Sequence, residues 1–293
     1  MNHKLLNNFV LIYLYSSIIH CRFRLIKLFF MHLTGQLTKM ITEYSSPIQY
    51  YLNFNDEIIM INQLLDKKIK IRFDHYKCKG CSLDKEIFSM GYCKECYFTS
   101  PYTGEWIIRP ELSRAHLGKE DRNLTIESQA QLQPHVVYLA NSGGVKVGVT
   151  RKSQLLFRWI DQGAEHAIKL AETENRYEAG LIESILKKHI SDKTNYRKML
   201  SEQVPDIDLT AVKNELITYI PECLINFVLD DNEVIDIQYP VITYPHKVKS
   251  INLKKIFEFD GVLKGVKGQY LMFDNNMVFN VRNHEGFVID LIL

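Results

Sequence analysis

The feature that most constrains this chain is a set of four cysteines in two closely spaced pairs. The stretch HYKCKGCSLDKEIFSMGYCKEC holds two C-x2-C pairs with eleven residues between them. The four cysteines are Cys78, Cys81, Cys93 and Cys96. Each C-x2-C loop can present two thiolates to one ion, and two such loops complete a tetrahedral shell of four sulfur atoms. We therefore predict a structural zinc site, which has no open coordination position for a substrate.

Cysteine usage also indicates the compartment. The other two cysteines, Cys21 and Cys223, are isolated, so the pattern does not suggest a disulfide framework. Metal binding in a reducing cytosol fits this usage, and we expect a cytoplasmic protein. Two alternatives to zinc stay open: four reduced cysteines without a metal, and a redox or iron–sulfur role.

Residues 1–30 stand apart from the rest of the chain. They include an apolar run, FVLIYLYSSII at 9–19, which is too short to span a bilayer as a helix and lacks a small-residue cleavage site. A secretory signal peptide and a membrane anchor are two interpretations of this run. We favour a third, in which Met31 or Met40 is the true start and residues 1–30 are an extension outside the domain. We accordingly expect no membrane association.

Apolar periodicity divides the remainder into β-rich ends and a central α/β unit, which together make an α+β fold. We predict a β-rich segment at 34–75, a cysteine module at 76–100, an α/β unit at 134–204 and a C-terminal β-rich domain at 215–293. The strands expected in the last region include ITYI (217–220) and INFVL (225–229). YYLNFNDEIIMIN near the N-terminus resembles QYLMFDNNMVFN near the C-terminus, so we expect the two β-rich ends to pair in one small barrel or sheet.

The α/β unit begins with HVVYLANSGGVKVGVT, residues 135–150. Two apolar runs flank Asn-Ser-Gly-Gly, a pattern typical of a β-hairpin. Helical spacing follows in SQLLFRWIDQ, which carries Arg158, and in RYEAGLIESILKKHI, which carries Glu183. On a helical wheel Glu183 borders the apolar stripe of its helix, where an unpaired carboxylate is costly. It therefore needs a metal ion or a cationic partner such as Arg158 or Arg176.

This constellation resembles the GIY-YIG nuclease superfamily, in which a hairpin carries two tyrosine-bearing motifs. In that superfamily an arginine lies on the next helix, and a glutamate on a later helix binds a divalent metal. Here VVY (136–138) matches the first motif, and KVG (146–148) matches the second with lysine in place of tyrosine. RW (158–159) lies near the expected position of the arginine, two residues further from the glycine than is common. AGLIE (179–183) resembles the glutamate helix, and Asn195 matches a trailing asparagine.

The resemblance implies a divalent-metal-dependent nuclease that cleaves phosphodiester bonds. Glu183 would hold Mg²⁺ or Mn²⁺ against the phosphate, and Arg158 would stabilise the charge of the transition state. Tyr138, or a water that it orients, would be the nucleophile or the general base. Lys146 would replace the missing tyrosine as a phosphate contact or, if desolvated, as a base.

Charge is unevenly distributed and favours a nucleic-acid partner at the α/β unit. The whole chain has a formal net charge of +2, but residues 144–198 hold 11 basic and 7 acidic residues, a net of +4. Such a local patch is what a nucleic-acid contact requires. The further candidates for this contact are Arg151, Lys152 and Asn195. The sequence leaves open the type of nucleic acid and the oligomeric state.

At the scale of the whole chain, residues 34–293 resemble the uncharacterised bacterial family filed as domain of unknown function 2797. The strings that carry this resemblance are GQLTKM, PIQYYL, IRPELSRAHLG, HVVYLANSGGVKVGVTR, RWIDQGA, NRYEAGLIE, DKTNYRKML and GVLKGVKGQYLMFD. The family implies no activity, so function rests on the site. The alternatives to a nuclease are a non-catalytic zinc-containing RNA- or DNA-binding module, and a protein-interaction adaptor on a decayed nuclease scaffold.

Overall fold

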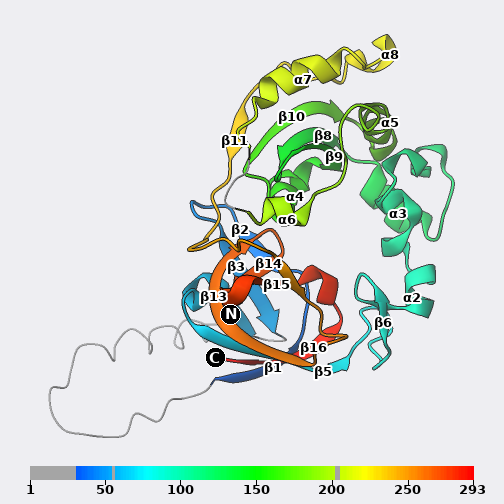
Figure 1. The fold of residues 1–293 in the computed structure, drawn as a ribbon. Helices are drawn as coiled ribbons and strands as arrows, with labels where there is room; N and C mark the ends of the chain where they lie inside the picture. The colour runs from blue at the N-terminus through cyan, green and yellow to red at the C-terminus, as the bar shows by residue number, and fades with distance from the viewer. Residues whose placement is uncertain (1–30, 55–56, 202–204) are drawn as a thin grey trace, which may run out of the picture. The chain divides into compact units, whose positions relative to one another are not determined.

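The computed structural model describes residues 31–54, 57–201 and 205–293, and residues 31–293 form one compact unit. The expected N-terminal extension, residues 1–30, lies outside the described part. Within that part, no helix is both long and apolar enough to cross a membrane. The unit combines β-sheets with helices, and Figure 1 shows how its elements follow one another along the chain.

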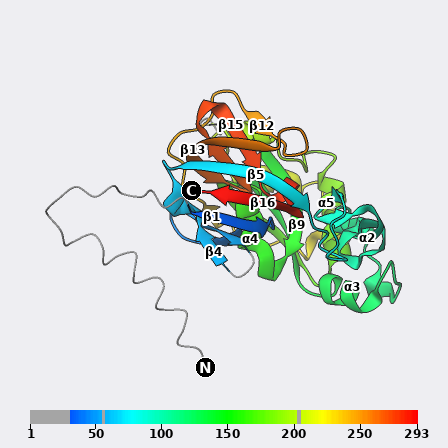
Figure 2. The ribbon, with the colours of Figure 1, turned by 90° about the horizontal axis from the view of Figure 1, so that it is seen from below.

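The N- and C-terminal β segments share one seven-stranded sheet. Its strand order is β1 (His32–Gln36), β16 (Phe287–Ile292), β5 (Lys68–Tyr76), β13 (Glu258–Lys267), β14 (Tyr270–Phe273), β15 (Met277–Asn280) and β12 (Lys249–Ile251). Neighbours pair antiparallel except β12 and β15, which pair in parallel. Because β5 lies between β16 and β13, the structure confirms that the two β-rich ends pair (Figure 2).

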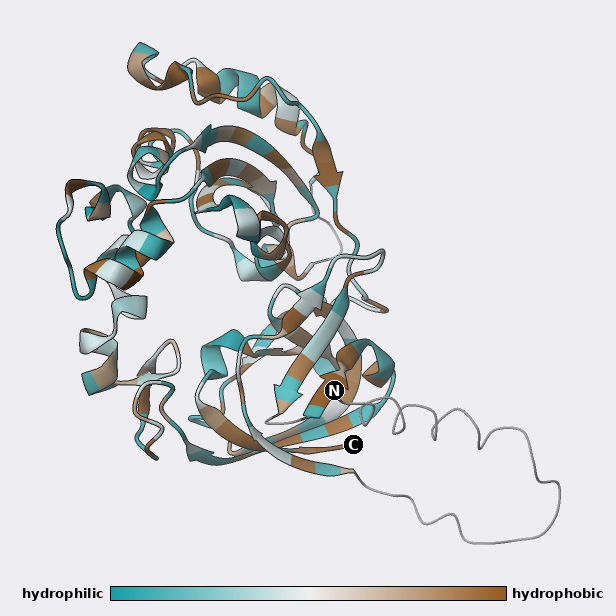
Figure 3. Cartoon of the chain, turned by 180° about the vertical axis from the view of Figure 1, so that it is seen from behind, coloured by the Kyte–Doolittle hydropathy of each residue, from teal (hydrophilic) through white to brown (hydrophobic). Residues whose placement is uncertain are grey.

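A smaller sheet contributes to the same core. It contains β2 (Ile41–Glu43), β3 (Gln49–Phe54) and β4 (Glu57–Met60). Tyr50, Leu52 and Phe54 alternate inward from β3 and share a core cluster with Phe273 and Phe279. Hydrophobic and hydrophilic residues alternate along several of these strands (Figure 3), which is the two-residue period that places one face of a strand on the core. The two segments of similar sequence are the hairpins β3–β4 and β14–β15, and they lie in different sheets.

A separate four-stranded antiparallel sheet holds the predicted hairpin. Its order is β11 (Val234–Asp236), β10 (His166–Thr173), β8 (His135–Asn141) and β9 (Val145–Arg151). The β8–β9 turn uses Gly143 and Gly144 at φ +79° and +144°, conformations that favour glycine. The two expected helices follow as α4 (Leu155–Asp161) and α5 (Arg176–Leu186), and both contact β9. Every residue of β8, the strand between β9 and β10, is buried.

Two of the expected strands do not form. The runs 217–220 and 225–229 each begin at the last residue of a helix, α7 (Leu209–Ile217) and α8 (Glu222–Ile225), and continue into turns. The prediction of strands at 217–220 and 225–229 is therefore wrong. Asp208 caps α7 by accepting two backbone N–H groups. Leu209 and Leu216, at helical spacing, join the core beneath the four-stranded sheet, and this packing outweighs the local β preference of the short apolar runs.

The segment between the cysteine module and the hairpin lies against α5. It contains η2 (Pro101–Thr103), η3 (Glu105–Ile107), η4 (Pro110–Leu112), η5 (Ala115–Leu117) and a short helix, α3 (Leu124–Gln131). Arg176 donates hydrogen bonds to the carbonyl oxygens of Trp106 at 3.0 Å and Ile107 at 2.8 Å. A Cβ on Gly180 would lie 2.3 Å from the backbone nitrogen of Glu111, so glycine lets η4 pack directly on α5.

A polar network joins the large sheet to the end of α4. Asp161 accepts hydrogen bonds from the Nζ of Lys39 and from the Nε2 of Gln269, the latter at 2.9 Å. Lys267, whose side chain is wholly buried, pairs with Glu165. A buried charge requires such a partner. These contacts hold the loop after α4 in place, and with it the four-stranded sheet.

Candidate functional site

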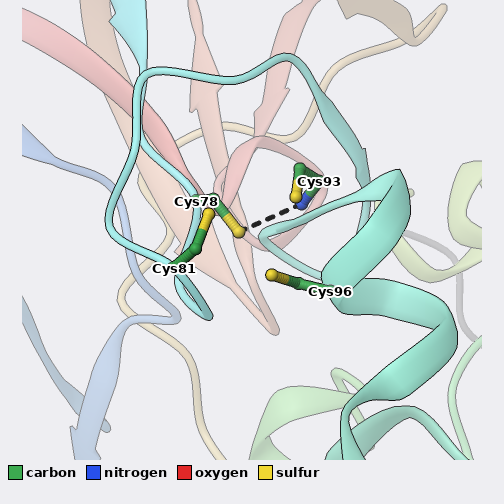
Figure 4. A group of neighbouring side chains, drawn as sticks. All are labelled: Cys78, Cys81, Cys93 and Cys96. Carbon is green, nitrogen blue, oxygen red and sulfur yellow. Dashed lines mark hydrogen bonds between the residues drawn. The ribbon is translucent and has the colours of Figure 1, made fainter.

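The structure brings the four predicted metal ligands together. Cys78 follows β5, Cys93 ends the short hairpin of β6 (Ile87–Ser89) and β7 (Tyr92–Cys93), and Cys96 lies in α2 (Lys94–Thr99). Their sulfur atoms and that of Cys81 all lie within 4.8 Å of one another (Figure 4). Four sulfur donors at this separation can hold one metal ion, and a soft thiolate set of this kind suits zinc or an iron–sulfur centre.

Backbone N–H groups stabilise the thiolate of one member of the quartet, Cys78. The Sγ of Cys78 accepts hydrogen bonds from the backbone N–H groups of Gly80 at 3.3 Å and Cys93 at 3.2 Å. Burial raises the pKa of Cys78, but these N–H groups outweigh it and bring its pKa to about 6. A Cβ on Gly80 would lie 2.9 Å from the Sγ of Cys96, so glycine is needed for the close approach of the two loops. The donor set therefore fits a metal ion.

Tyr138 points from β8 across the hairpin onto Gly148. The two residues are cross-strand neighbours, and a Cβ on Gly148 would lie 2.6 Å from the Tyr138 hydroxyl. That hydroxyl donates to the Oε1 of Gln162 at 3.0 Å. Burial raises the pKa of Tyr138, and the nearby Arg158 guanidinium partly offsets this shift. Because Tyr138 is wholly buried, it can position Arg158 and Gln162 but presents no surface to a large substrate.

Lys146 is a buried lysine with an unusual environment. It is 4 % exposed, and its Nζ donates to the hydroxyl of Thr194. Burial lowers the pKa of Lys146 most, the positive charge of Arg158 lowers it too, and Asp192 and Glu183 act in the opposite direction, so that the pKa is about 7. A lysine with such a pKa is partly neutral at pH 7 and can accept a proton.

Glu183 is a buried carboxylate without a close partner. It is 7 % exposed, and the nearest cation among the described residues is the Nζ of Lys187 at 4.0 Å. Burial raises the pKa of Glu183, Lys187 and Arg176 act in the opposite direction, and the pKa that results is about 7. Neither Arg158 nor Arg176 forms an ion pair with Glu183 within the described part, so the predicted structural pairing with these arginines is not found.

Arg158 is the most accessible member of this group. It lies half-buried on α4 and has no ion pair within 4.0 Å in the described ranges. Its charge acts on both Tyr138 and Lys146, and the charge of Glu183 acts on the same two residues. The four residues singled out from the sequence therefore lie in one cluster, contributed by the hairpin, α4 and α5.

The predicted nucleic-acid contacts have less distinctive surroundings. Arg151 is exposed at the end of β9. Lys152 is also exposed and forms an ion pair with Glu172 at 2.7 Å. The side chain of Asn195 accepts from the backbone N–H groups that follow it and so caps the short helix α6 (Tyr196–Met199). Lys152 and Asn195 thus have structural partners already.

Several residues near the cluster were not identified from the sequence. Glu111 and Asp192 both raise the pKa of Glu183, and Thr194 accepts from Lys146. Gln162 accepts a hydrogen bond from Tyr138. The one sequence signal for Glu111 is Gly180, because a glycine inside a helix often marks a close approach of another backbone.

For a divalent cation, Glu183 would be a single protein ligand. Within the described residues, the cysteine quartet is the one group of three or more metal-ligating side chains close enough to share an ion. Mg²⁺ retains several waters and is often bound by one or two carboxylates together with substrate phosphates. A single carboxylate near an arginine that has no ion pair in the described part fits that mode, and it does not fit a site made by protein ligands alone.

Comparison with known proteins gives one match. A family model described as "Protein of unknown function (DUF2797)" matches residues 66–289. The matched range includes the cysteine quartet, the hairpin and both helices of the cluster. No curated protein and no solved structure matches the chain.

Proposed function

The chain belongs to the DUF2797 family, whose description names no activity, and from the cluster itself we propose that the protein binds nucleic acid and cleaves phosphodiester bonds with a divalent metal ion. The observation that carries this proposal is the meeting of Tyr138, Lys146, Arg158 and Glu183 around one hairpin. The order of parts supports it: a hairpin, then an arginine on the next helix, then a glutamate on a later helix. The GIY-YIG superfamily, which the sequence resembles, has the same order.

Each residue has a role that its surroundings support. Arg158, which has no counter-ion in the described part, would contact the phosphate and stabilise its developing negative charge. Lys146, with its pKa of about 7, would accept a proton from the attacking water. The water oxygen bonds to phosphorus as the bond to the leaving oxygen breaks, and solvent protonates that oxygen. Tyr138 is a positioning residue, because its hydroxyl is enclosed between Gln162 and the arginine.

Glu183 would hold the divalent ion, Mg²⁺ or Mn²⁺. Such an ion, when bound, polarises the phosphate and lowers the charge that Arg158 must stabilise. Glu183 is ready for this role because no cation lies closer than 4.0 Å to its carboxylate among the described residues. A bound cation would also relieve the cost of the buried charge.

Cleavage assays on matched variants test the proposal. Glu183→Gln should abolish Mg²⁺- or Mn²⁺-dependent cleavage of labelled DNA or RNA and leave binding nearly intact, because it removes a negative charge facing the phosphate. Arg158→Ala should weaken both, because the cation contributes in the ground state and in the transition state. The control is Glu215→Gln on the exposed face of α7. Thermal melts identify misfolded variants. A well-folded wild type with no affinity for any nucleic acid would overturn the proposal.

A non-catalytic nucleic-acid-binding module is the second candidate. The observation that favours it is that two of the proposed catalytic side chains are enclosed by the protein. Tyr138 is wholly buried, and Lys146 is hydrogen-bonded to Thr194. A protein of this kind would bind nucleic acid through Arg158 and show no cleavage with either metal. The same assays distinguish the two candidates.

We also propose that the cysteine quartet holds one structural zinc ion, in a reducing compartment such as the cytosol. Support comes from the four sulfur donors within 4.8 Å and the N–H groups aimed at Cys78. Purified protein should carry about one zinc per chain, measured by elemental analysis after anaerobic preparation. Cys93→Ser should lower that content and the melting temperature, whereas Cys223→Ser, at an exposed free cysteine, should change neither. Folded protein without metal would contradict the assignment.

A further inference from the structure

A pocket of about 500 Å³ lies between the 105–121 segment and the first turn of α5. Its volume falls within the range of small-molecule sites, roughly 300–1,000 Å³. The lining residues that matter here are Trp106, Glu111, Ser113, Arg114, His116 and Tyr177. None of them belongs to the cluster described above.

The segments that form the pocket are fixed in place by hydrogen bonds and by close backbone packing. Arg176 ties η3 to α5 through the carbonyl oxygens of Trp106 and Ile107. Gly180 brings the backbone of η4 onto the same helix. The side chain of Gln131 accepts from the backbone N–H of Ala115 at 3.0 Å, which fixes η5. A pocket with a rigid frame can select a ligand by shape.

Three lining residues carry buried polar atoms that lack a hydrogen-bond partner in the described structure. They are the Nε1 of Trp106, the Oε2 of Glu111 and the Oγ of Ser113. The first can only donate, the second can only accept when ionised, and the third can do either. Unpartnered buried groups of this kind are costly. Small side-chain rotations would let a ligand with both a donor and an acceptor edge satisfy them.

Aromatic rings and charges narrow the class of ligand further. The rings of His116 and Tyr177 stack with centroids 4.4 Å apart and planes inclined by 23°, which provides a flat aromatic surface. The carboxylates of Glu105 and Asp121 join that of Glu111 around the pocket, so hydrogen-bond donors on the ligand are favoured. Arg114 is exposed and has no ion pair in the described part, and so remains available for an anion.

We propose that this pocket binds a nucleobase that carries an exocyclic amino group, with the attached phosphate next to Arg114. A flat ring meets the aromatic surface, the amino group donates to a carboxylate, and a ring acceptor takes the Trp106 N–H. Carboxylates accept from base amino groups in this way when proteins recognise cytosine. Glu111 also links the pocket to the cluster, because its Oε2 lies 3.9 Å from the Nζ of Lys187, which lies 4.0 Å from Glu183. A base of a bound strand is one source of the ligand, and this source rests on the proposed function; a free nucleotide is the other.

Calorimetric titration of the full chain with AMP, CMP, GMP and UMP tests the free-nucleotide source. The three amino-bearing nucleotides should bind at least about tenfold more tightly than UMP, which has no amino group. Single-stranded homopolymers of the same bases test the strand source and should show the same order. Equal binding of UMP and of the other nucleotides, or no binding by any monomer or strand, would overturn the proposal.

Matched variants locate the binding. Glu111→Gln and Tyr177→Ala should each weaken binding of the amino-bearing base about tenfold. The control is Tyr219→Ala, which removes a similar stacked pair with His189 elsewhere on the surface. Ser113→Ala removes one hydroxyl that has no hydrogen-bond partner in the described structure, and it changes the volume little. A loss of binding in this variant is therefore not explained by misfolding. Nucleotide binding without cleavage would leave the pocket assignment intact and contradict the nuclease. Cleavage that is insensitive to Glu111→Gln and Tyr177→Ala would support the nuclease and exclude a base of the cleaved strand as the ligand, and the pocket assignment would be overturned if these variants also left nucleotide binding unchanged.

Discussion

His135, the first residue of the hairpin, should make folding stability depend on pH. It is wholly buried, its Nδ1 lies 2.7 Å from the carbonyl oxygen of Gln133, and its Nε2 has no partner in the described structure. Burial lowers the pKa of His135 to about 4, whereas an unfolded histidine titrates near 6.5. Between these values the unfolded chain binds more protons, so the free energy of unfolding falls as pH is lowered.

The expected loss between pH 7.5 and pH 5 is about 2 kcal/mol from this residue. Urea unfolding at the two pH values measures it. His135→Phe should reduce the loss, though His284, whose pKa burial also lowers, will retain part of it. His246→Phe, at an exposed position, should leave the loss unchanged. Identical pH dependence in wild type and His135→Phe would show that His135 is protonated without cost in the folded state.

Sequence reasoning identified the four residues of the cluster in two ways. Glu183 attracts notice because it borders the apolar stripe of its helix, whereas Tyr138, Lys146 and Arg158 were identified through the resemblance to the GIY-YIG superfamily. The structure brings these four together. Glu111, Asp192 and Thr194 were missed because nothing local marks them. Glu111 lies 72 positions before Glu183 and reaches it only through the packing of η4 on α5.

At the scale of the element, Gly180 allows η4, in the segment before the hairpin, to pack directly on α5. In an exposed helix Gly→Ala gains about 1 kcal/mol. Here the new Cβ would lie 2.3 Å from the backbone nitrogen of Glu111, which cannot rotate away. Gly180→Ala should therefore destabilise the protein by about 1–3 kcal/mol. Chemical denaturation measures the change, with Ser184→Ala on the same helix as the control. A gain in stability would mean that η4 is not held against the helix.

Elements with strong periodicity were predictable, and elements stabilised by distant contacts were not. The hairpin and the helices that carry Arg158 and Glu183 form where their apolar spacing indicates. ITYI and INFVL were misread as strands because they are short β-branched or aromatic runs, whereas each begins at the last residue of a helix and continues into a turn. The helix before ITYI, α7, is stabilised by the capping carboxylate of Asp208 and by packing of Leu216 beneath the four-stranded sheet.

For the whole molecule, composition and repeats predicted an α+β fold with paired ends. The pairing of β5 with β13 and β16 confirms the second expectation. The network of Asp161, Lys39 and Gln269 was beyond sequence reasoning, because its members are more than 100 positions apart. This network holds the loop after α4 against the large sheet, so residues from both ends of the chain support the position of the arginine helix.

The salt dependence of nucleic-acid binding tests most directly whether the cluster faces a phosphate. The logarithm of the binding constant falls linearly with the logarithm of salt concentration, with a slope of roughly 0.9 per phosphate contact for B-DNA and roughly 0.7 for single strands. Arg158→Ala should reduce the magnitude of that slope by about one contact, because under the proposed function the half-buried Arg158 contacts a phosphate. Lys188→Ala, at an exposed lysine near the end of α5, should leave it unchanged. An unchanged slope in Arg158→Ala would contradict the account.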